Sequence, residues 1–125
     1  MNAKQWEVFF VPSCRYAKPP KDKFIVVAYI NPCPHGFFIN SKINKFIRNR
    51  PNLLSCEAQI LVSQHTFLKY DSYVDCRDLF SFVDSDLTRS RGILSLDAQT
   101  AILSAVDACP VLEEHHKIKI LDRDE

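Results

Sequence analysis

The chain has 125 residues, of which 46% are hydrophobic and 25% are charged, and its formal net charge is +1. This length predicts one domain that spans residues 1–125, and the composition excludes an intrinsically disordered chain. No window approaches the ~18 apolar residues of a membrane-spanning helix, so no membrane association is expected, and the near-neutral charge neither favours nor excludes nucleic acid.

The first third of the chain predicts short strands. Residues 6–11, WEVFFV, form an apolar run that Pro12 is expected to end. Residues 24–30, FIVVAYI, are almost entirely β-branched or aromatic, which is typical of a strand buried on both sides. The composition of NPCPHG then predicts a turn, and residues 37–40 predict another short strand.

The middle of the chain predicts one brief helix and further strands. Residues 42–48 place three apolar side chains at helical spacing before Pro51. Residues 57–63, 72–76 and 78–83 are rich in strand-forming residues. Strand after short strand at close spacing predicts a small barrel or sandwich.

The C-terminal part predicts one long helix from residue 95 to residue 109. Ser95 is a good N-cap, Asp97 places negative charge in the first turn, and Pro110 marks the end. Apolar and small residues recur at helical spacing, so this face is expected to cover the sheet. Residues 117–121, KIKIL, alternate as a final edge strand, and the tail DRDE is expected to fray. The predicted class is therefore mainly β with a C-terminal helix (α+β).

Five cysteines are widely spaced along the chain: Cys14, Cys33, Cys56, Cys76 and Cys109. The odd count, the spacing and an N-terminus without an export signal predict reduced thiols and a cytoplasmic protein.

The segment SCRYAKPPKDK is predicted to form an exposed basic loop, because its adjacent prolines fit neither a helix nor a central strand. Its cations flank Tyr16, and this combination suits contact with phosphates and stacking on bases. A solvated loop that only keeps the protein soluble is the alternative. The cations are Arg15, Lys18, Lys21 and Lys23.

The tetrapeptide SQHT, residues 63–66, follows the predicted strand 57–63 and is a second candidate site. His65 is a possible general acid or base near neutral pH, and an exposed loop histidine is the alternative. The other His and Cys residues lack the paired spacing of structural zinc sites, so no metal and no cofactor are expected. Asp84 and Asp86 fit a polar turn better than a metal site.

Several stretches occur in an order that resembles the MazF/PemK family of toxins from bacterial toxin–antitoxin pairs. They are the basic loop with its prolines, the hydrophobic strand, the strand ending in Ser or Thr, SYVDC-RDLFSF, DSDLTRSRG and ILSLDAQTAILSAVDACPVL. The match is best from Ser72 to Leu112. The resemblance implies an SH3-like barrel of about five to seven strands, metal-independent cleavage of single-stranded RNA, a homodimer and a cognate antitoxin protein as partner.

The resemblance also implies roles for individual residues. Family members carry an Arg-Pro pair before the second strand, and Lys23 and Phe24 stand at the matching positions. A lysine keeps the charge of the arginine but lacks its bidentate fork. The family's catalytic Thr or Ser lies at the end of a middle strand, where Ser63 is the best match and Thr66 the second.

The expected catalytic residues are accordingly Lys23, Ser63 and His65. Ser63 or His65 would assist attack by a ribose 2′-hydroxyl, and Lys23 would stabilise the developing charge. The expected RNA contacts are Arg15, Lys18, Lys21, Thr66 and Lys69.

Two alternative functions remain open at this stage. One is the same barrel without catalysis, acting as a module that binds a protein or a nucleic acid. The other is a small accessory protein of a phage or mobile element that docks an apolar surface, such as HGFFIN, on a partner. A buried strand is the competing interpretation of that segment.

Overall fold

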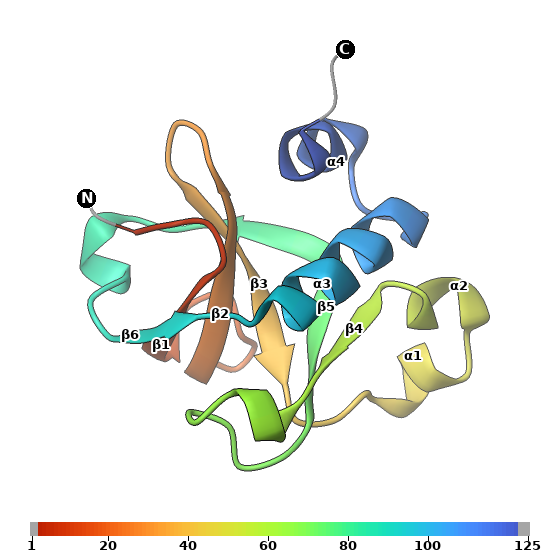
Figure 1. Cartoon of the computed structure of the whole chain (residues 1–125), viewed down its shortest axis with the longest axis horizontal. Coiled ribbons are helices and arrows are strands. Elements are labelled where there is room, and N and C mark those ends of the chain that lie inside the picture. The colour runs from red at the N-terminus through yellow and green to blue at the C-terminus, as the bar shows by residue number, and fades with distance from the viewer. Residues whose placement is uncertain (1–2, 123–125) are drawn as a thin grey trace.

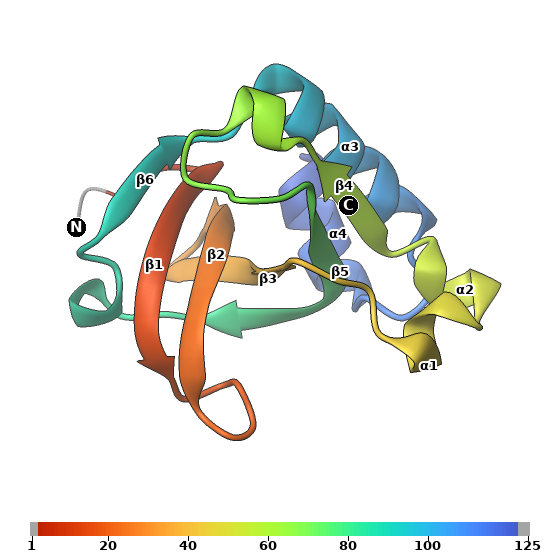
Figure 2. The same ribbon diagram turned by 90° about the horizontal axis from the view of Figure 1, so that it is seen from below.

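The computed structural model describes residues 3–122, and these residues form one curled antiparallel sheet packed against helices (Figure 1). The sheet has six strands in the order β4-β5-β3-β2-β1-β6. The predicted α+β class with a small barrel is confirmed, because the sheet curls into a half-barrel (Figure 2). The strands are β1 (Glu7–Cys14), β2 (Lys21–Ile30), β3 (Pro34–Asn40), β4 (Glu57–Ile60), β5 (Ser72–Ser81) and β6 (Ser90–Ile93).

The strand β2 is buried on both faces, as its sequence predicts. Because successive side chains of a strand point to opposite faces, Val26 and Ala28 join the larger core beneath the helices. Ile25 and Val27 join a second, smaller core inside the curl of the sheet, together with Phe82. A strand between two cores needs apolar residues at every position, which explains the continuous run FIVVAYI.

The helix α3 (Leu96–Ala108) confirms the prediction of a helix over residues 95–109. The hydroxyl of Ser95 accepts a hydrogen bond from the backbone N–H of Ala98 at 3.1 Å, so Ser95 is the N-cap. The apolar face of α3 packs on β4 and β5 (Figure 1). Its buried residues are Ala98, Ile102, Ala105 and Val106.

The prediction of an edge strand at residues 117–121 is wrong, because these residues belong to a second C-terminal helix, α4 (Glu114–Leu121). Five alternating residues are too few to separate a period of 2 from a period of 3.6. Helical spacing lets His116 and Ile120 face the same side, where Ile120 is buried and His116 Nδ1 lies 2.7 Å from the hydroxyl of Tyr29. The tail prediction falls mainly on residues 123–125, which lie outside the described residues.

The basic loop is shorter than predicted, because β1 continues past Pro12 and Lys21 and Lys23 belong to β2. Lys23 pairs with Val11, and Lys21 pairs with Cys14 across an irregular register. Pro12 is tolerated because β6 pairs only with Glu7 and Phe9, so no strand requires its missing N–H on that side.

The two strands predicted at residues 72–76 and 78–83 are one strand, β5, which ends at Ser81. Its pairing with β3 shifts between Gly36↔Phe80 and Phe38↔Asp75, so the strand bends between the two stretches that were predicted as separate strands. β4 ends at Ile60, and Ser63 therefore lies in the short 3-10 helix η1 (Val62–Gln64) rather than in a strand. A second 3-10 helix, η2 (Asp84–Asp86), forms the polar turn expected there.

The brief helix predicted over residues 42–48 is present as α1 (Lys45–Arg48), and α2 (Pro51–Leu54) follows it. The side chain of Asn44 caps α1 by accepting from the N–H of Ile47 at 2.9 Å. The segment HGFFIN forms most of β3 inside the sheet, with Phe37 fully buried, which agrees with the interpretation as a buried strand. Within residues 3–122, no helix is long and apolar enough to cross a membrane.

The prediction of five reduced thiols is wrong for two of them, since Cys56 and Cys109 form a disulfide. Cys56 immediately precedes β4, and Cys109 is the C-cap of α3. The two residues are 53 positions apart in the chain, and the packing of α3 on β4 brings them together. The spacing of the cysteines along the sequence therefore could not predict this disulfide. Cys14, Cys33 and Cys76 are free.

Candidate functional site

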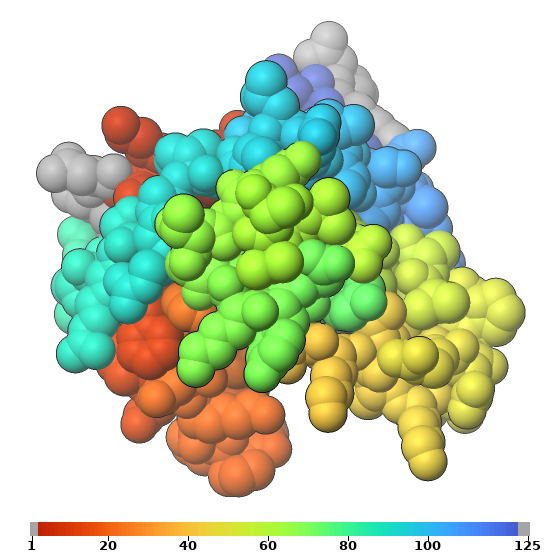
Figure 3. Space-filling view, turned by 60° about the horizontal axis from the view of Figure 1, so that its bottom comes forward, coloured from red at the N-terminus to blue at the C-terminus, as the bar shows by residue number. Residues whose placement is uncertain are grey.

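A cleft of about 660 Å³ opens at the end of the sheet where β2 begins and β3 ends. The start of β4, the segment after β3 and the loop before β5 complete its walls. Figure 3 shows the face where the orange start of β2, the yellow segment after β3 and the green loop before β5 meet. This volume lies in the range of small-ligand pockets, and nearly every wall contributes a charged or aromatic side chain.

The cleft is lined by cations and aromatic rings. Its lysines come from β2, from the segment after β3 and from the loop before β5, so they surround the opening. The rings of Phe24 and Phe67 meet edge to face at 5.1 Å between centroids, and Tyr70 is 67% exposed. The lining lysines are Lys21, Lys23, Lys42 and Lys69.

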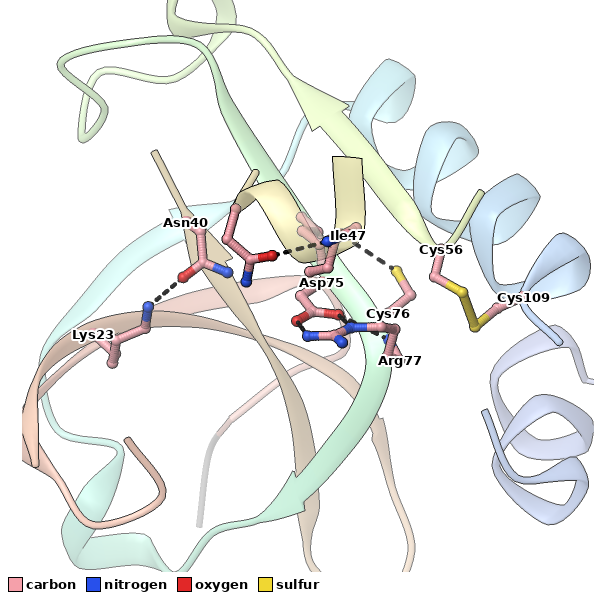
Figure 4. Close-up of polar contacts among 10 residues, drawn as sticks. Lys23, Asn40, Ile47, Cys56, Asp75, Cys76, Arg77 and Cys109 are labelled. Atoms are coloured by element: carbon pink, nitrogen blue, oxygen red, sulfur yellow. Dashed lines mark hydrogen bonds and ion pairs between the residues drawn. A yellow bond between two sulfur atoms is a disulfide. The ribbon is translucent and has the colours of Figure 1, made fainter. Parts of the chain in front are cut away.

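Lys23 is the most enclosed of these lysines. Its ammonium donates a hydrogen bond to Oδ1 of Asn40 at the end of β3 (Figure 4). It also lies 4.9 Å from the ring centroid of Phe38. Burial lowers the pKa of Lys23, and the nearby charge of Lys21 lowers it further. Lys23 therefore places in the cleft a cation that releases its proton more readily than an exposed lysine does.

Two carboxyl groups lie opposite each other on the β4 side of the cleft. Glu57 of β4 pairs with Asp75 of β5 in the sheet register, and both residues line the cleft. Arg77 donates two hydrogen bonds to Asp75, from Nε to Oδ1 at 3.0 Å and from Nη2 to Oδ2 at 2.9 Å (Figure 4). These charge-assisted hydrogen bonds fix the position of the Asp75 side chain.

Glu57 is the most strongly perturbed carboxyl group of the site. Burial raises the pKa of Glu57 to about 8, and the charge of Asp75 and a hydrogen bond with it add to the shift, while Arg77 opposes it. Oε2 of Glu57 is buried and has no hydrogen-bond partner among residues 3–122. The pair therefore holds one proton at neutral pH.

A band of rings and cations leads away from the cleft. Phe24 meets Phe10 of β1 at 5.5 Å between ring centroids. The guanidinium groups of Arg89 and Arg91 lie 5.9 and 5.5 Å from the centroid of Phe10. Alternating rings and cations of this kind suit a single strand of nucleic acid.

Only some of the residues singled out in the sequence meet in the cleft. Lys21, Lys23 and Lys69 line it, whereas the others lie outside it. The guanidinium of Arg15 is paired with Asp86 at 3.1 Å, and that hydrogen bond raises the pKa of Arg15. The candidates outside the lining are Arg15, Lys18, Ser63, His65 and Thr66.

His65 is buried rather than exposed, and both of its ring nitrogens are engaged. Nδ1 lies 2.8 Å from the carbonyl oxygen of Leu61, and Nε2 accepts the backbone N–H of Ser95 at 3.1 Å. This arrangement requires the proton on Nδ1. The contacts attach the loop before β5 to the N-terminus of α3, and Gln64 adds a hydrogen bond with the hydroxyl of Ser95 at 2.7 Å.

Sequence reasoning missed Asn40, Glu57 and Asp75. The strand end beside Lys23 is the end of β3, so Asn40 occupies the place that was expected for Ser63. Glu57 and Asp75 were both placed in predicted strands, but their proximity depends on the β4–β5 register, which no local pattern reveals. Across residues 3–122, no group of three or more His, Cys, Asp or Glu side chains is arranged to hold a metal ion.

Comparison with known proteins identifies the fold. No protein-family model matches this sequence, and no curated protein matches it. Among solved structures 33 chains match. One is the Mycobacterium tuberculosis toxin MazF-mt6, with a TM-score of 0.56 and 14% sequence identity over 95% of this chain and 99% of that chain. The chain therefore has a MazF-like fold, as the resemblance of its segments implied.

Proposed function

We propose that this protein, built on the MazF-like fold, is a toxin that binds single-stranded RNA in the cleft and cleaves it without a metal ion. The observation that carries the proposal is the half-buried Lys23, held by Asn40 among three further lysines and the rings of Phe24, Phe67 and Tyr70. The likeness to MazF-mt6 supports it.

The lysines of the cleft suit the phosphate backbone of an RNA strand. Lys21, Lys42 and Lys69 are exposed and stand on different walls, so each is free to neutralise a separate phosphate. Phe67 and Tyr70 offer ring faces and edges to unpaired bases. A cleft of about 660 Å³ has room for one or a few unstacked nucleotides.

The proposed reaction is attack of a ribose 2′-hydroxyl on its own 3′-phosphate, which gives a 2′,3′-cyclic phosphate and a free 5′-hydroxyl. Lys23 stabilises the negative charge that develops on the phosphoryl oxygens. Asn40 restricts the ammonium of Lys23 to one direction, which partly replaces the geometric constraint of an arginine fork.

The remaining candidates from the sequence have lesser parts in this proposal. His65 positions the loop before β5, because its two nitrogens are already engaged. Ser63 and Thr66 are exposed on that loop, and Arg15 and Lys18 lie outside the cleft. We retain Thr66, Arg15 and Lys18 as outlying RNA contacts, and Ser63 as a catalytic candidate to be tested against Asn40.

The test is cleavage of end-labelled single-stranded RNA by the purified protein in excess chelator. We expect wild type to give fragments ending in a 2′,3′-cyclic phosphate, and Lys23→Ala to lose about 100-fold or more in rate. Lys45→Ala is the matched control, since it removes an exposed lysine of α1 from outside the cleft lining. Equal loss in both variants, or intact RNA with wild type, contradicts the proposal.

A second candidate function is RNA binding without cleavage. The lysine at the position of the family's arginine favours it, because a lysine contacts phosphate through a point charge only. RNA binding that weakens steeply with salt, with no fragments at any protein concentration, supports this candidate over the first.

Partners and location are also proposals. The likeness to a toxin supports a homodimer, a cognate antitoxin protein and a cytoplasmic site of action. Growth arrest on expression, relieved by co-expression of a small neighbouring gene, tests the antitoxin. Sedimentation of the purified chain tests the dimer.

A further inference from the structure

Glu57 and Asp75 form a pair of carboxyl groups on the wall of the cleft that binding of RNA phosphates does not explain. They lie directly opposite each other on neighbouring antiparallel strands, where two like charges are destabilising. An RNA-binding surface has no need of acids among its lysines. A pair of acids that retains one proton is instead suited to proton transfer.

We propose that Glu57 is the proton-transfer residue of this cleft, accepting the proton of the attacking 2′-hydroxyl, with Asp75 and Arg77 as its positioning residues. This inference rests on the proposed function, because it assigns a role in the same cleavage reaction.

The contacts of the pair decide which member is the active one. Both oxygens of Asp75 accept hydrogen bonds from Arg77, at 3.0 and 2.9 Å, so Asp75 has little capacity left for a substrate. Glu57 shares a hydrogen bond with Asp75, but its Oε2 is buried and has no donor among residues 3–122. Glu57 is therefore the member that changes its protonation.

The surroundings of Glu57 suit exchange of this proton near neutral pH. Its pKa is raised to about 8, first by burial and then by Asp75, and a general base works best when its pKa lies near the working pH. The thiol of Cys76, which follows Asp75 in β5, is buried, and burial raises its pKa. The charged groups that shift the pKa of Glu57 are Asp75 and Arg77 on β5. The other charged residues of the cleft lining are Lys21, Asp22 and Lys23 on β2, Lys42 after β3 and Lys69 on the loop before β5.

The proton transfers of this step use only Glu57, Lys23 and water. The 2′-oxygen gives its proton to the Glu57 carboxylate and forms a bond to phosphorus, while the bond from phosphorus to the 5′-oxygen breaks. The ammonium of Lys23, whose lowered pKa makes it the better donor, gives a proton to that leaving oxygen. Water then returns a proton from Glu57 to Lys23.

The experiment measures single-turnover cleavage of single-stranded RNA from pH 5.5 to 9.5. For wild type we expect the logarithm of the rate to rise with unit slope up to about pH 8, the pKa of Glu57, and to level off above it as the carboxyl becomes fully charged. The Glu57→Gln variant should cleave about 100-fold or more slowly at pH 8, and its rate should no longer rise with pH between 5.5 and 8. The Glu57→Asp variant should cleave more slowly than wild type but keep the rise of the rate with pH.

Asp75→Asn is the second readout. Because the charge of Asp75 raises the pKa of Glu57, this variant should shift the rising limb to lower pH. A chain with 2′-deoxyribose at every position, which cannot be cleaved by this route, should bind to wild type and to Glu57→Gln with affinities within about twofold, since no phosphate contact is removed.

The outcomes separate the two proposals. Wild-type cleavage together with a Glu57→Gln variant of unchanged rate and pH profile overturns the role of Glu57 and leaves the proposed function standing. RNA left intact by wild type at every pH overturns the proposed function and this role with it. Loss of deoxy-strand binding in Glu57→Gln overturns the role in proton transfer in favour of one in binding.

Discussion

The ring of His65 accepts the backbone N–H of Ser95 at 3.1 Å, which links the loop before β5 to the N-cap of the longest helix, thirty positions further along the chain. The same ring reaches the carbonyl of Leu61 through its other nitrogen. A histidine with two such bonds and a buried side chain is a structural element of the cleft wall.

Replacing His65 by Ala should therefore reduce stability more than it reduces chemistry. The change leaves the N–H of Ser95 without its partner, while the carbonyl of Leu61 still accepts from the N–H of Gln64. We expect the free energy of unfolding to fall by about 1–3 kcal/mol. Urea unfolding measures this, with Thr66→Ala, an exposed neighbour, as the control expected to change by less than about 0.5 kcal/mol. A fully folded His65→Ala variant without RNA cleavage would instead support a catalytic histidine.

Asn40 and Ser63 are the two candidates for the polar side chain that assists cleavage from a strand end. Because Asn40 orients the ammonium of Lys23, Asn40→Ala should slow RNA cleavage by about ten- to a hundredfold. Ser63→Ala should stay within about twofold of wild type, since Ser63 does not line the cleft. Rates measured at saturating RNA decide between them, and the reverse order would restore Ser63 as the family's catalytic residue.

Lys42 and Lys69 were placed in the cleft as phosphate contacts. Replacing either by Ala should weaken binding of single-stranded RNA and lower the slope of log affinity against log salt by about 0.7. Fluorescence anisotropy over a salt series measures this slope. Lys45→Ala on α1, outside the cleft lining, should leave it unchanged. Equal slopes in all variants would place the RNA elsewhere.

The buried carboxyl of Glu57 should make stability depend on pH in a defined direction. Its pKa in the folded protein, about 8, lies above the ordinary value of 4.5. The folded state therefore retains a proton that the unfolded state loses, and the free energy of unfolding falls as pH rises from about 4.5 to about 8.

Glu57→Gln removes this dependence, so the variant should become progressively more stable relative to wild type between these pH values, with no further change above pH 8. Urea unfolding of both proteins at pH 5, 6.5, 8 and 9 measures the difference. A constant difference across that range would show that Glu57 titrates normally.

The disulfide between Cys56 and Cys109 closes a loop of 53 positions. By the chain-entropy estimate, reducing it should lower the free energy of unfolding by about 4 kcal/mol. Chemical unfolding with and without reductant measures this. The Cys56→Ala/Cys109→Ala double variant should not respond to reductant, whereas Cys33→Ser, which alters a free thiol, should respond as wild type does. Equal stability of wild type in both conditions contradicts the prediction.

The sequence by itself determined the elements whose signals are local. The run FIVVAYI has no polar face and lies in the strand β2. Ser95, Asp97 and Pro110 predicted both ends of the helix α3 to within one residue. Caps and hydrophobic periods act over a few residues, so they can be read without the fold. The order of these elements also carried the resemblance that the MazF-like fold bears out.

Tertiary structure alone decided the composition of the cleft. The pairing of Glu57 with Asp75, the contact of Lys23 with Asn40 and the disulfide each join residues that are more than fifteen positions apart. Such pairs depend on strand register and on the packing of α3, and a shift of one residue in register would turn each side chain to the other face of the sheet. The lysines Lys21, Lys23 and Lys69 could therefore be predicted from the sequence, while Asn40, Glu57 and Asp75 could not, because their roles depend on contacts across the sheet.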